Sequence, residues 1–307
     1  TTLAKNIAKL LGSIEVNDCP YNCLASAPKC PICREKIKKK EKIKTKTISG
    51  LDRFIRVQGS PDLTVEDLFG DIDPIKAMKF GPMSIEAFTP GKIFKANNGV
   101  LFFDEINRCN EKLQNALLQV LEEKKITLGS YTIDFEVNFI LIATMNPYDY
   151  STEMLSDVFI DRFDIIKMGY PENKEIEKEI VIKKAKHLQG VEFPDQLLDR
   201  VITFIRDLRN DENLEKKPSV RASIGIYERA CANAIIEHRK VVTTEDIEDA
   251  IISVLYPKIR LKPSVRYVMK KEDYIRKKYE SSSLGFDLSE SKESSEQTQE
   301  EKRGDYL

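Results

Sequence analysis

The sequence predicts an α/β protein in which a doubly wound parallel sheet comes first and a separate helical domain follows. Three observations predict it. Short apolar runs alternate with helical patterns as far as Pro171, only helical patterns follow from there to residue 256, and four cysteines cluster between residues 19 and 33. Strands alternating with helices are typical of a parallel sheet covered by helices. The 307 residues leave room for about two domains of roughly 150 residues each.

Composition and charge restrict the function classes. With 41% hydrophobic and 32% charged residues, no run approaches the roughly 20 apolar residues of a membrane-spanning helix. No signal-peptide pattern begins the chain. The net charge of -1 argues against a general polyanion binder, so nucleic acid is not an expected partner. Six cysteines in so charged a chain indicate a reducing cytoplasm and favour a metal site over disulfides.

The first fifty residues contain a helix and a long connection. Residues 2–11 have leucine, isoleucine and alanine at helical spacing, so a helix is under way from the first residue. A start inside a helix, without methionine, indicates a fragment. Residues 12–50 are expected to form a connection that carries the cysteine cluster. A basic run follows the cluster over residues 34–46, with eight Lys or Arg against two Glu, and is interpreted as a solvated arm.

The sheet elements are predicted from apolar runs with turn residues beside them. Residues 100–103 are bounded by Gly99 and Asp104, as expected for a strand buried on both faces. Residues 111–124 place four leucines on one helical face, and residues 65–79 form a polar, partly helical stretch. The predicted strands span residues 54–57, 100–103, 139–142 and 165–168.

The remaining chain is predicted to be helical and then disordered. Thr243 with Asp246 three residues on resembles a capping box, which marks the start of the last of four helices. The predicted helices span residues 172–189, 194–209, 219–238 and 244–255. The resulting domains are a core over 1–171, which includes the 12–50 insertion, a helical domain over 172–256, a basic helical extension over 257–280 and an acidic, serine-rich disordered tail over 281–307.

Asp104 and Glu105 are the most informative polar pair. They follow a buried strand, at the carboxyl edge where parallel sheets bind ligands. Asp104 could hold Mg²⁺, and Glu105 could activate a water for attack on phosphorus. Alone, such a pair is more often only the polar end of a strand.

Three residues later in the chain have side chains that suit phosphoryl transfer at the same site. Asn146 follows the next buried strand and could orient the same water. Arg162 precedes another predicted strand, and a guanidinium suits the charge on a transferring phosphoryl group. Arg221 lies in the first turn of a predicted helix, where the helix dipole favours anions. A phosphate would resolve that conflict, and so would a salt bridge to an acid.

These segments together resemble the AAA+ ATPases, in the branch of the magnesium chelatase ATPase subunit and the MoxR proteins. The resemblance covers residues 1–11 and 51–256 and is carried by GVLFFDEINRCNEKLQNALLQVLEE, FILIATMNP, DRFD and SVRASIGIYERA. It implies an AAA+ core with a four-helix lid domain, and a hexameric ring with ATP and Mg²⁺ between subunits. The implied roles are Walker B for Asp104 and Glu105, sensor 1 for Asn146, a finger for Arg162 and sensor 2 for Arg221.

The family's phosphate loop, a glycine-rich turn ending in Gly-Lys-Thr/Ser, is absent from the printed sequence. Thr1 and Thr2 resemble the residues that follow its Gly-Lys, so Thr1 is expected to be the hydroxyl ligand of Mg²⁺, and both threonines are expected to bind the cofactor. Backbone amides and a lysine in that loop cradle the phosphates. The chain as printed is therefore expected to bind ATP poorly and to hydrolyse it slowly or not at all, whereas an intact parent would do both.

The cysteine cluster predicts a structural metal site. Cys19, Cys23, Cys30 and Cys33 can close a tetrahedral shell that leaves no open position. Metal bonds would replace the hydrophobic core that so polar a loop lacks. Zinc is the first choice, and an iron–sulfur cluster or plain reduced thiols are the alternatives.

The leading hypothesis is a ring-forming ATPase that remodels a partner protein. By resemblance, that partner carries a von Willebrand A-type domain, and the client is a chelatase subunit that inserts Mg²⁺ into a porphyrin. A MoxR-like chaperone that activates metalloenzymes is almost equally expected. The alternatives are a DNA-acting AAA+ ATPase, which would bind DNA in a salt-sensitive way, and a non-hydrolysing scaffold that contains zinc.

Overall fold

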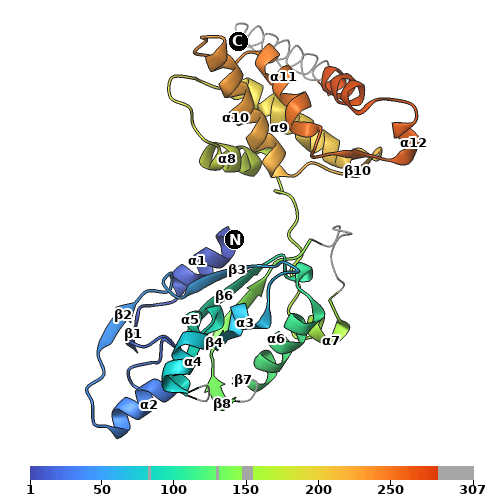
Figure 1. The fold of residues 1–307 in the computed structure, drawn as a ribbon. Helices are drawn as coiled ribbons and strands as arrows, with labels where there is room; N and C mark the ends of the chain where they lie inside the picture. The colour runs from blue at the N-terminus through green and yellow to red at the C-terminus, as the bar shows by residue number, and fades with distance from the viewer. Residues whose placement is uncertain (82–83, 129–130, 147–154, 283–307) are drawn as a thin grey trace, which may run out of the picture. The chain divides into compact units, whose positions relative to one another are not determined.

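A computed structural model describes residues 1–81, 84–128, 131–146 and 155–282. The chain divides into two compact units, Thr1–Ile166 and Lys167–Leu307 (Figure 1). Each unit has its own apolar core. The predicted tail is outside the described residues from position 283 onward, and residues 281–282 are helical.

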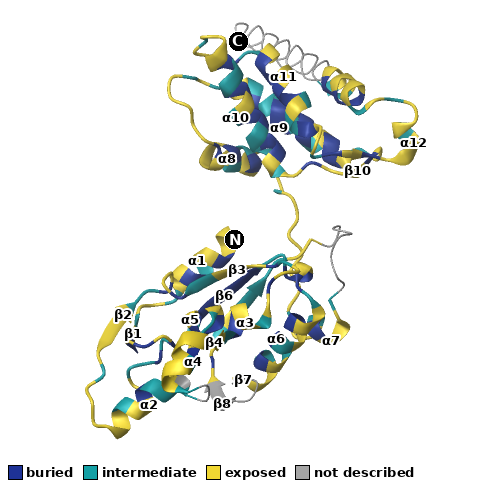
Figure 2. Cartoon of the chain, in the orientation of Figure 1, coloured by how far each residue is buried: buried dark blue, intermediate teal, exposed yellow. Residues whose placement is uncertain are grey.

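Three parallel strands form the sheet of the first unit. Their order is β3 (Phe54–Gln58), β6 (Gly99–Asp104) and β9 (Phe139–Ala143), so β6 lies between the other two. β6 is buried from Gly99 to Phe103 (Figure 2), as a strand covered on both faces must be. The predicted α/β class and these three strands are confirmed.

Helices and short hairpins surround this sheet. The predicted leucine-faced helix is α6 (Glu111–Glu123), which buries Leu113 and Leu117, and its first turn is capped by the side chain of Asn110. The other helices are α1 (Thr2–Leu10), α3 (Val65–Phe69), α4 (Pro74–Phe80), α5 (Lys92–Lys95) and α7 (Asp157–Ile160). β4 (Gly70–Ile72) pairs antiparallel with β5 (Phe88–Pro90), with α4 between them in sequence, and β7 (Lys125–Leu128) forms a hairpin with β8 (Tyr131–Glu136).

The strand predicted over residues 165–168 is wrong. These residues have no regular structure, and Ile166 and Met168 are 76% and 79% exposed. An apolar run becomes a strand only where another strand pairs with it. Here the run crosses the boundary between the two units, and no described strand runs beside it.

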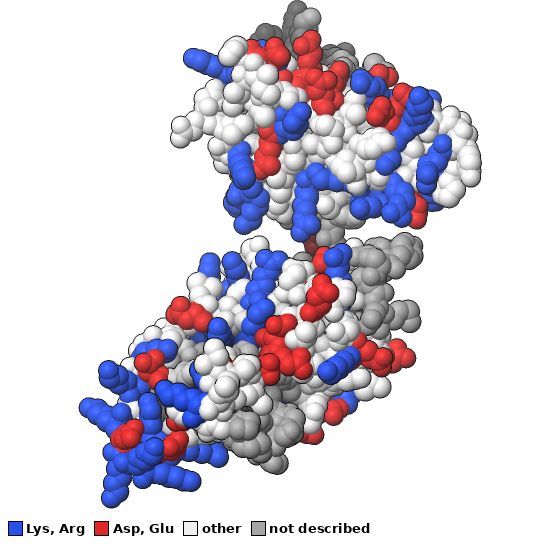
Figure 3. Space-filling model, viewed as in Figure 1, with Lys and Arg blue, Asp and Glu red and all other residues white. Residues whose placement is uncertain are grey.

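The cysteine-containing segment has more structure than a connection. β1 (Ile14–Asn17) pairs antiparallel with β2 (Thr45–Ile48), and α2 (Pro31–Lys38) lies between them in sequence. Figure 3 shows lysine and arginine side chains gathered around α2 and the chain that follows it. Lys38, Lys40, Lys42 and Lys44 of this basic run are exposed, as a solvated arm would be.

The second unit contains the four predicted helices. They are α8 (Lys174–Lys184), α9 (Asp195–Asn210), α10 (Val220–Ile236) and α11 (Thr244–Leu255). Asp246 accepts hydrogen bonds from the backbone and hydroxyl of Thr243, so the capping box is confirmed. A short pair of strands, β10 (Leu214–Lys216) and β11 (Arg260–Leu261), precedes α12 (Pro263–Arg266) and a helix from residue 271 to 282. Among the described residues, no helix is long and apolar enough to cross a membrane.

Candidate nucleotide site and metal centre

Asp104 lies where β6 ends, and both oxygens of its carboxylate have partners. The Thr144 hydroxyl donates to Oδ1 at 2.7 Å, and Arg56 of β3 donates to Oδ2 at 2.6 Å. Burial favours a raised pKa, but the Thr144 hydrogen bond and the Arg56 guanidinium outweigh it and lower the pKa of Asp104. Asp104 is therefore an ionised carboxylate at the edge of the sheet, as a Mg²⁺ ligand must be.

The backbone at Glu105 is left-handed, with φ of 57° and ψ of 52°. Its N–H donates to the Thr144 hydroxyl at 3.1 Å. Its carboxylate accepts a hydrogen bond from Gln58 at 3.0 Å and pairs with Arg108 at 3.2 Å. A non-glycine residue in this region is uncommon, and strained backbone of this kind is enriched at functional sites.

Gly59 allows β3 to approach this turn closely. Its N–H donates to the Asp104 carbonyl at 2.7 Å. A Cβ at position 59 would lie 2.0 Å from the Glu105 carbonyl oxygen, so no other residue fits without moving the backbone. This contact explains why a glycine directly follows β3.

The predicted residues outside this pair are placed as follows. Thr1 caps α1 without a side-chain hydrogen bond. Thr2 is the first residue of α1 and is exposed. Asn146 is exposed just after β9, and its carbonyl accepts a hydrogen bond from Asn107 at 3.3 Å.

The two predicted arginines lie elsewhere. Arg162 follows α7, forms a salt bridge with Glu122 of α6 and donates to the Val158 carbonyl at 3.3 Å. No bond between described residues joins Arg162 to the acidic pair. Arg221 belongs to the second unit, where it is exposed in the first turn of α10.

Three residues of this site were not identified from the sequence. Thr144 joins Asp104 to the backbone of Glu105. Arg56 and Gln58 alternate with apolar residues along β3, so both point to one face of the strand. Gln58 also accepts a hydrogen bond from Arg56 at 3.3 Å. Polar residues near the end of an otherwise apolar strand were the available signal.

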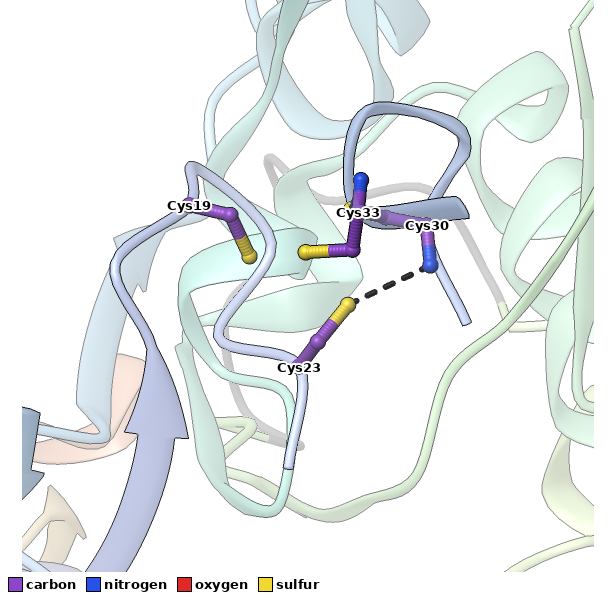
Figure 4. Close-up of side chains that lie close together, drawn as sticks. All are labelled: Cys19, Cys23, Cys30 and Cys33. Carbon is purple, nitrogen blue, oxygen red and sulfur yellow. Dashed lines mark hydrogen bonds between the residues drawn. The ribbon is translucent and has the colours of Figure 1, made fainter. Parts of the chain in front are cut away.

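The four clustered cysteines form a compact group of sulfur atoms. All four are buried, and their Sγ atoms lie within 4.8 Å of one another. The side chains converge on one point from the loop before α2 and from the start of α2 (Figure 4). A tetrahedral ion with Zn–S bonds of about 2.3 Å fits a cluster of this size.

Hydrogen bonds to sulfur also fit a metal site. Cys30 N–H donates to Cys23 Sγ at 3.3 Å (Figure 4). Cys33 N–H donates to Cys30 Sγ at 3.2 Å. Hydrogen bonds with the thiols of Cys23 and Cys30 lower the pKa of Cys19 and raise the pKa of those two partners. Burial also raises the pKa of Cys33, so without a metal only Cys19 is favoured as a thiolate, the form in which cysteine binds metal.

A buried parallel strand that ends in an Asp-Glu pair, with polar groups of both neighbouring strands beside it, lies at the sheet edge where parallel α/β folds bind ligands, and its groups are of the kind that phosphoryl chemistry uses. The chain matches the model of the ATPase family associated with various cellular activities (AAA) over residues 37–165 and that of the AAA lid domain over residues 206–276. The chain belongs to this family, as an AAA+ ATPase of the magnesium chelatase and MoxR type.

Its relatives include proteins of both types. The magnesium-chelatase subunit ChlI homolog of Methanocaldococcus jannaschii is 30% identical over 86% of this chain and 76% of its own length. Chaperone MoxR1 of Mycobacterium tuberculosis is 28% identical over 66% of this chain and 59% of its own. A cryo-EM-based structure of the BchI–BchD complex of magnesium chelatase is 18% identical, with a TM-score of 0.42, over 88% of this chain and 87% of that chain.

Proposed function

We propose that this protein hydrolyses ATP at the edge of β6 and uses the energy to remodel a partner protein. The carrying observation is the Asp104–Glu105 pair, held by Thr144 in a chain of an ATPase family. The family implies ATP together with Mg²⁺, and Mg²⁺ fits the hard oxygen ligands that Asp104 and Thr1 offer. When bound, Mg²⁺ supplies charge neutralisation on the phosphate oxygens.

The remaining chemistry is assigned to side chains of the chain. Asp104 holds Mg²⁺, either directly or through water, Thr1 supplies its hydroxyl as a further ligand, and Thr2, the first residue of α1, is assigned to bind the cofactor. Glu105 accepts a proton from the attacking water, while Gln58 and Arg108 hold its carboxylate in place. Asn146 orients the same water.

Phosphate binding needs a loop that the printed chain does not contain. A chain without that loop is therefore proposed to bind and hydrolyse ATP poorly, and a chain with a Gly-Lys-containing loop placed ahead of Thr1 is proposed to bind and hydrolyse it well. ATP turnover by both proteins under the same conditions tests this proposal. Equal turnover would overturn the assigned role of the loop.

The ring and the finger residue are proposed together. In a hexameric ring, Arg162 would reach the nucleotide of the neighbouring subunit. Its exposed position supports this role. Arg221 is proposed as sensor 2 because it is an exposed arginine at a helix start.

Mixing two inactive variants tests the action of Arg162 on its neighbour. We expect Arg162→Ala and Glu105→Gln each to lower ATP turnover by at least about 100-fold. An equal mixture of the two should recover up to roughly a quarter of wild-type turnover, because random assembly pairs an intact Glu105 with an intact Arg162 at that share of interfaces. Arg266→Ala is the control and should stay fully active. A mixture that stays inactive after subunit exchange contradicts action between subunits.

The partner is proposed from the relatives. Their printed names include a magnesium-chelatase subunit and a chaperone. A protein partner with a von Willebrand A-type domain suits both, with a chelatase or another metalloenzyme as the client. Pull-down with candidate partners in the presence and absence of ATP tests this assignment. Binding that does not depend on nucleotide would contradict it.

The cysteine cluster is proposed to bind Zn²⁺, and its reduced thiols fit a cytoplasmic location. We expect about one zinc per chain by elemental analysis and a large loss of zinc in Cys30→Ser. Cys109→Ser, which changes a buried cysteine outside the cluster, should retain zinc. Iron with acid-labile sulfide, or no metal, would contradict the zinc assignment.

A further inference from the structure

The loop between Cys19 and Cys23 packs against the segment that leads into β6. The Tyr21 ring meets the Phe94 ring edge-on at 5.1 Å between centroids, and both side chains are 1% exposed. The Tyr21 carbonyl accepts a hydrogen bond from the Asn97 side chain at 3.1 Å. Residues more than 70 positions apart in sequence are thus joined by both apolar and polar contacts.

Asn22 extends this contact along the same segment. Its side chain donates to the Lys95 carbonyl at 3.1 Å, and its own carbonyl accepts from the Asn98 side chain at 3.4 Å. Asn22 and Asn98 both have left-handed backbones, with φ of 47° and 57°. Asparagine tolerates this conformation better than most residues, so the contact depends on a defined geometry on both sides.

The same segment also holds the start of β9. The Asn97 side chain accepts a hydrogen bond from the Asn138 N–H at 3.0 Å, and the Asn98 N–H donates to the Asn138 carbonyl at 2.5 Å. Asn98 immediately precedes β6, and Asn138 immediately precedes β9. Asn97 is therefore a link between the cysteine loop and both strands.

These two strands carry the candidate catalytic groups at their other ends. β6 ends at Asp104, followed by Glu105, and β9 ends just before Thr144. β6 and β9 are paired in register from Gly99 to Phe103. Because a paired strand moves as a unit, loosening the start of β6 or β9 changes how their ends meet.

We propose that the metal centre is an internal brace of the ATPase core, which fixes the starts of β6 and β9 through Asn97. The inference rests on the zinc assignment proposed above. The metal binds all four cysteines. It therefore fixes residues 20–22, which lie between two of its ligands, Cys19 and Cys23. Without it, that short loop keeps few apolar contacts besides those of Tyr21 and the cysteines. The Cys₄ insertion therefore supports the catalytic strands and is not an independent binding module.

Hydrogen exchange with and without zinc tests the brace. The full chain is measured as purified and after zinc removal by a chelator under reducing conditions. We expect exchange in residues 99–104 and 139–143 to become at least about tenfold faster after removal. Exchange in α9 to α11 should be unchanged, which gives an internal control. Unchanged exchange in β6 and β9 would overturn the brace while leaving the zinc assignment intact, and the absence of bound zinc would overturn both.

Asn97→Ala separates the link from the metal. This variant keeps all four cysteines, so we expect the wild-type zinc content, together with fast exchange in β6 and β9 whether or not zinc is present. Lys42→Ala, on the exposed part of the same insertion, should behave as the wild type. A zinc-dependent response in Asn97→Ala as large as in the wild type would overturn the role of Asn97.

Discussion

Replacing Arg209 with alanine is expected to destabilise the second unit by about 3–5 kcal/mol. Arg209 donates two hydrogen bonds of 2.6 Å to the carboxylate of Glu177, which is fully buried. Ser223 donates a third to the same carboxylate at 2.7 Å. Without Arg209, the buried carboxylate of Glu177 is left with the hydrogen bond from Ser223 and with the Arg206 guanidinium 3.8 Å away. Removing Arg209 takes away both short hydrogen bonds and the nearest opposite charge of a buried carboxylate, and the more distant Arg206 compensates this loss only in part.

Urea denaturation of the full chain, monitored by circular dichroism, measures this loss of unfolding free energy. Hydrogen exchange in α8 to α10 assigns the loss to the second unit. Arg206→Ala is the matched control. Because Arg206 is part-exposed and lies farther from Glu177, we expect its loss to be smaller, on the order of 1 kcal/mol. Replacing both members of the pair, as Glu177→Leu with Arg209→Met, should recover much of the stability. A loss below about 1 kcal/mol in Arg209→Ala would contradict this account of the pair.

The sheet and the lid helices could be predicted because their apolar patterns are strong. β6 is covered on both faces, so its residues from Val100 to Phe103 had to be apolar, and α10 and α11 repeat apolar residues at helical spacing. The antiparallel pair of β1 and β2 could not be predicted in this way. β2 has no buried residue, and the pair is held by backbone hydrogen bonds that composition does not record.

The site was predictable where chemistry is local in the sequence. Asp104 and Glu105 follow their strand directly, and the cysteines lie within fifteen residues of one another. Arg56 and Thr144 reach Asp104 only because parallel pairing aligns β3 and β9 with β6. Asn97 could not be identified, since its role depends on contacts with residues 76 and 41 positions away.

Replacing Glu105 with glutamine is expected to lower ATP turnover by the full-length gene product at least about 100-fold. Glutamine keeps the size of the side chain and its hydrogen bonding with Gln58, but it cannot accept a proton from water. ATP binding should therefore stay within about threefold of the wild type. Asp104→Asn should instead lose the dependence of ATP binding on Mg²⁺, because it removes the proposed metal ligand.

Glu111→Gln is the matched control for the Glu105 substitution. Glu111 is exposed in the first turn of α6, six residues after Glu105, and no role in the site is assigned to it. Its replacement should leave ATP turnover within about twofold of the wild type. Comparable losses in the two variants would indicate a general effect of charge on folding or assembly and would contradict a specific role for Glu105.

The most direct test of ATP hydrolysis at the β6 edge is steady-state ATP turnover by the full-length gene product, measured beside its Glu105→Gln variant at equal nucleotide occupancy. The account predicts Mg²⁺-dependent turnover in the wild-type protein and at least about 100-fold less in the variant. Equal turnover in the two proteins would contradict the assignment of Glu105, and a wild-type protein that binds ATP without hydrolysing it would contradict the proposed activity itself.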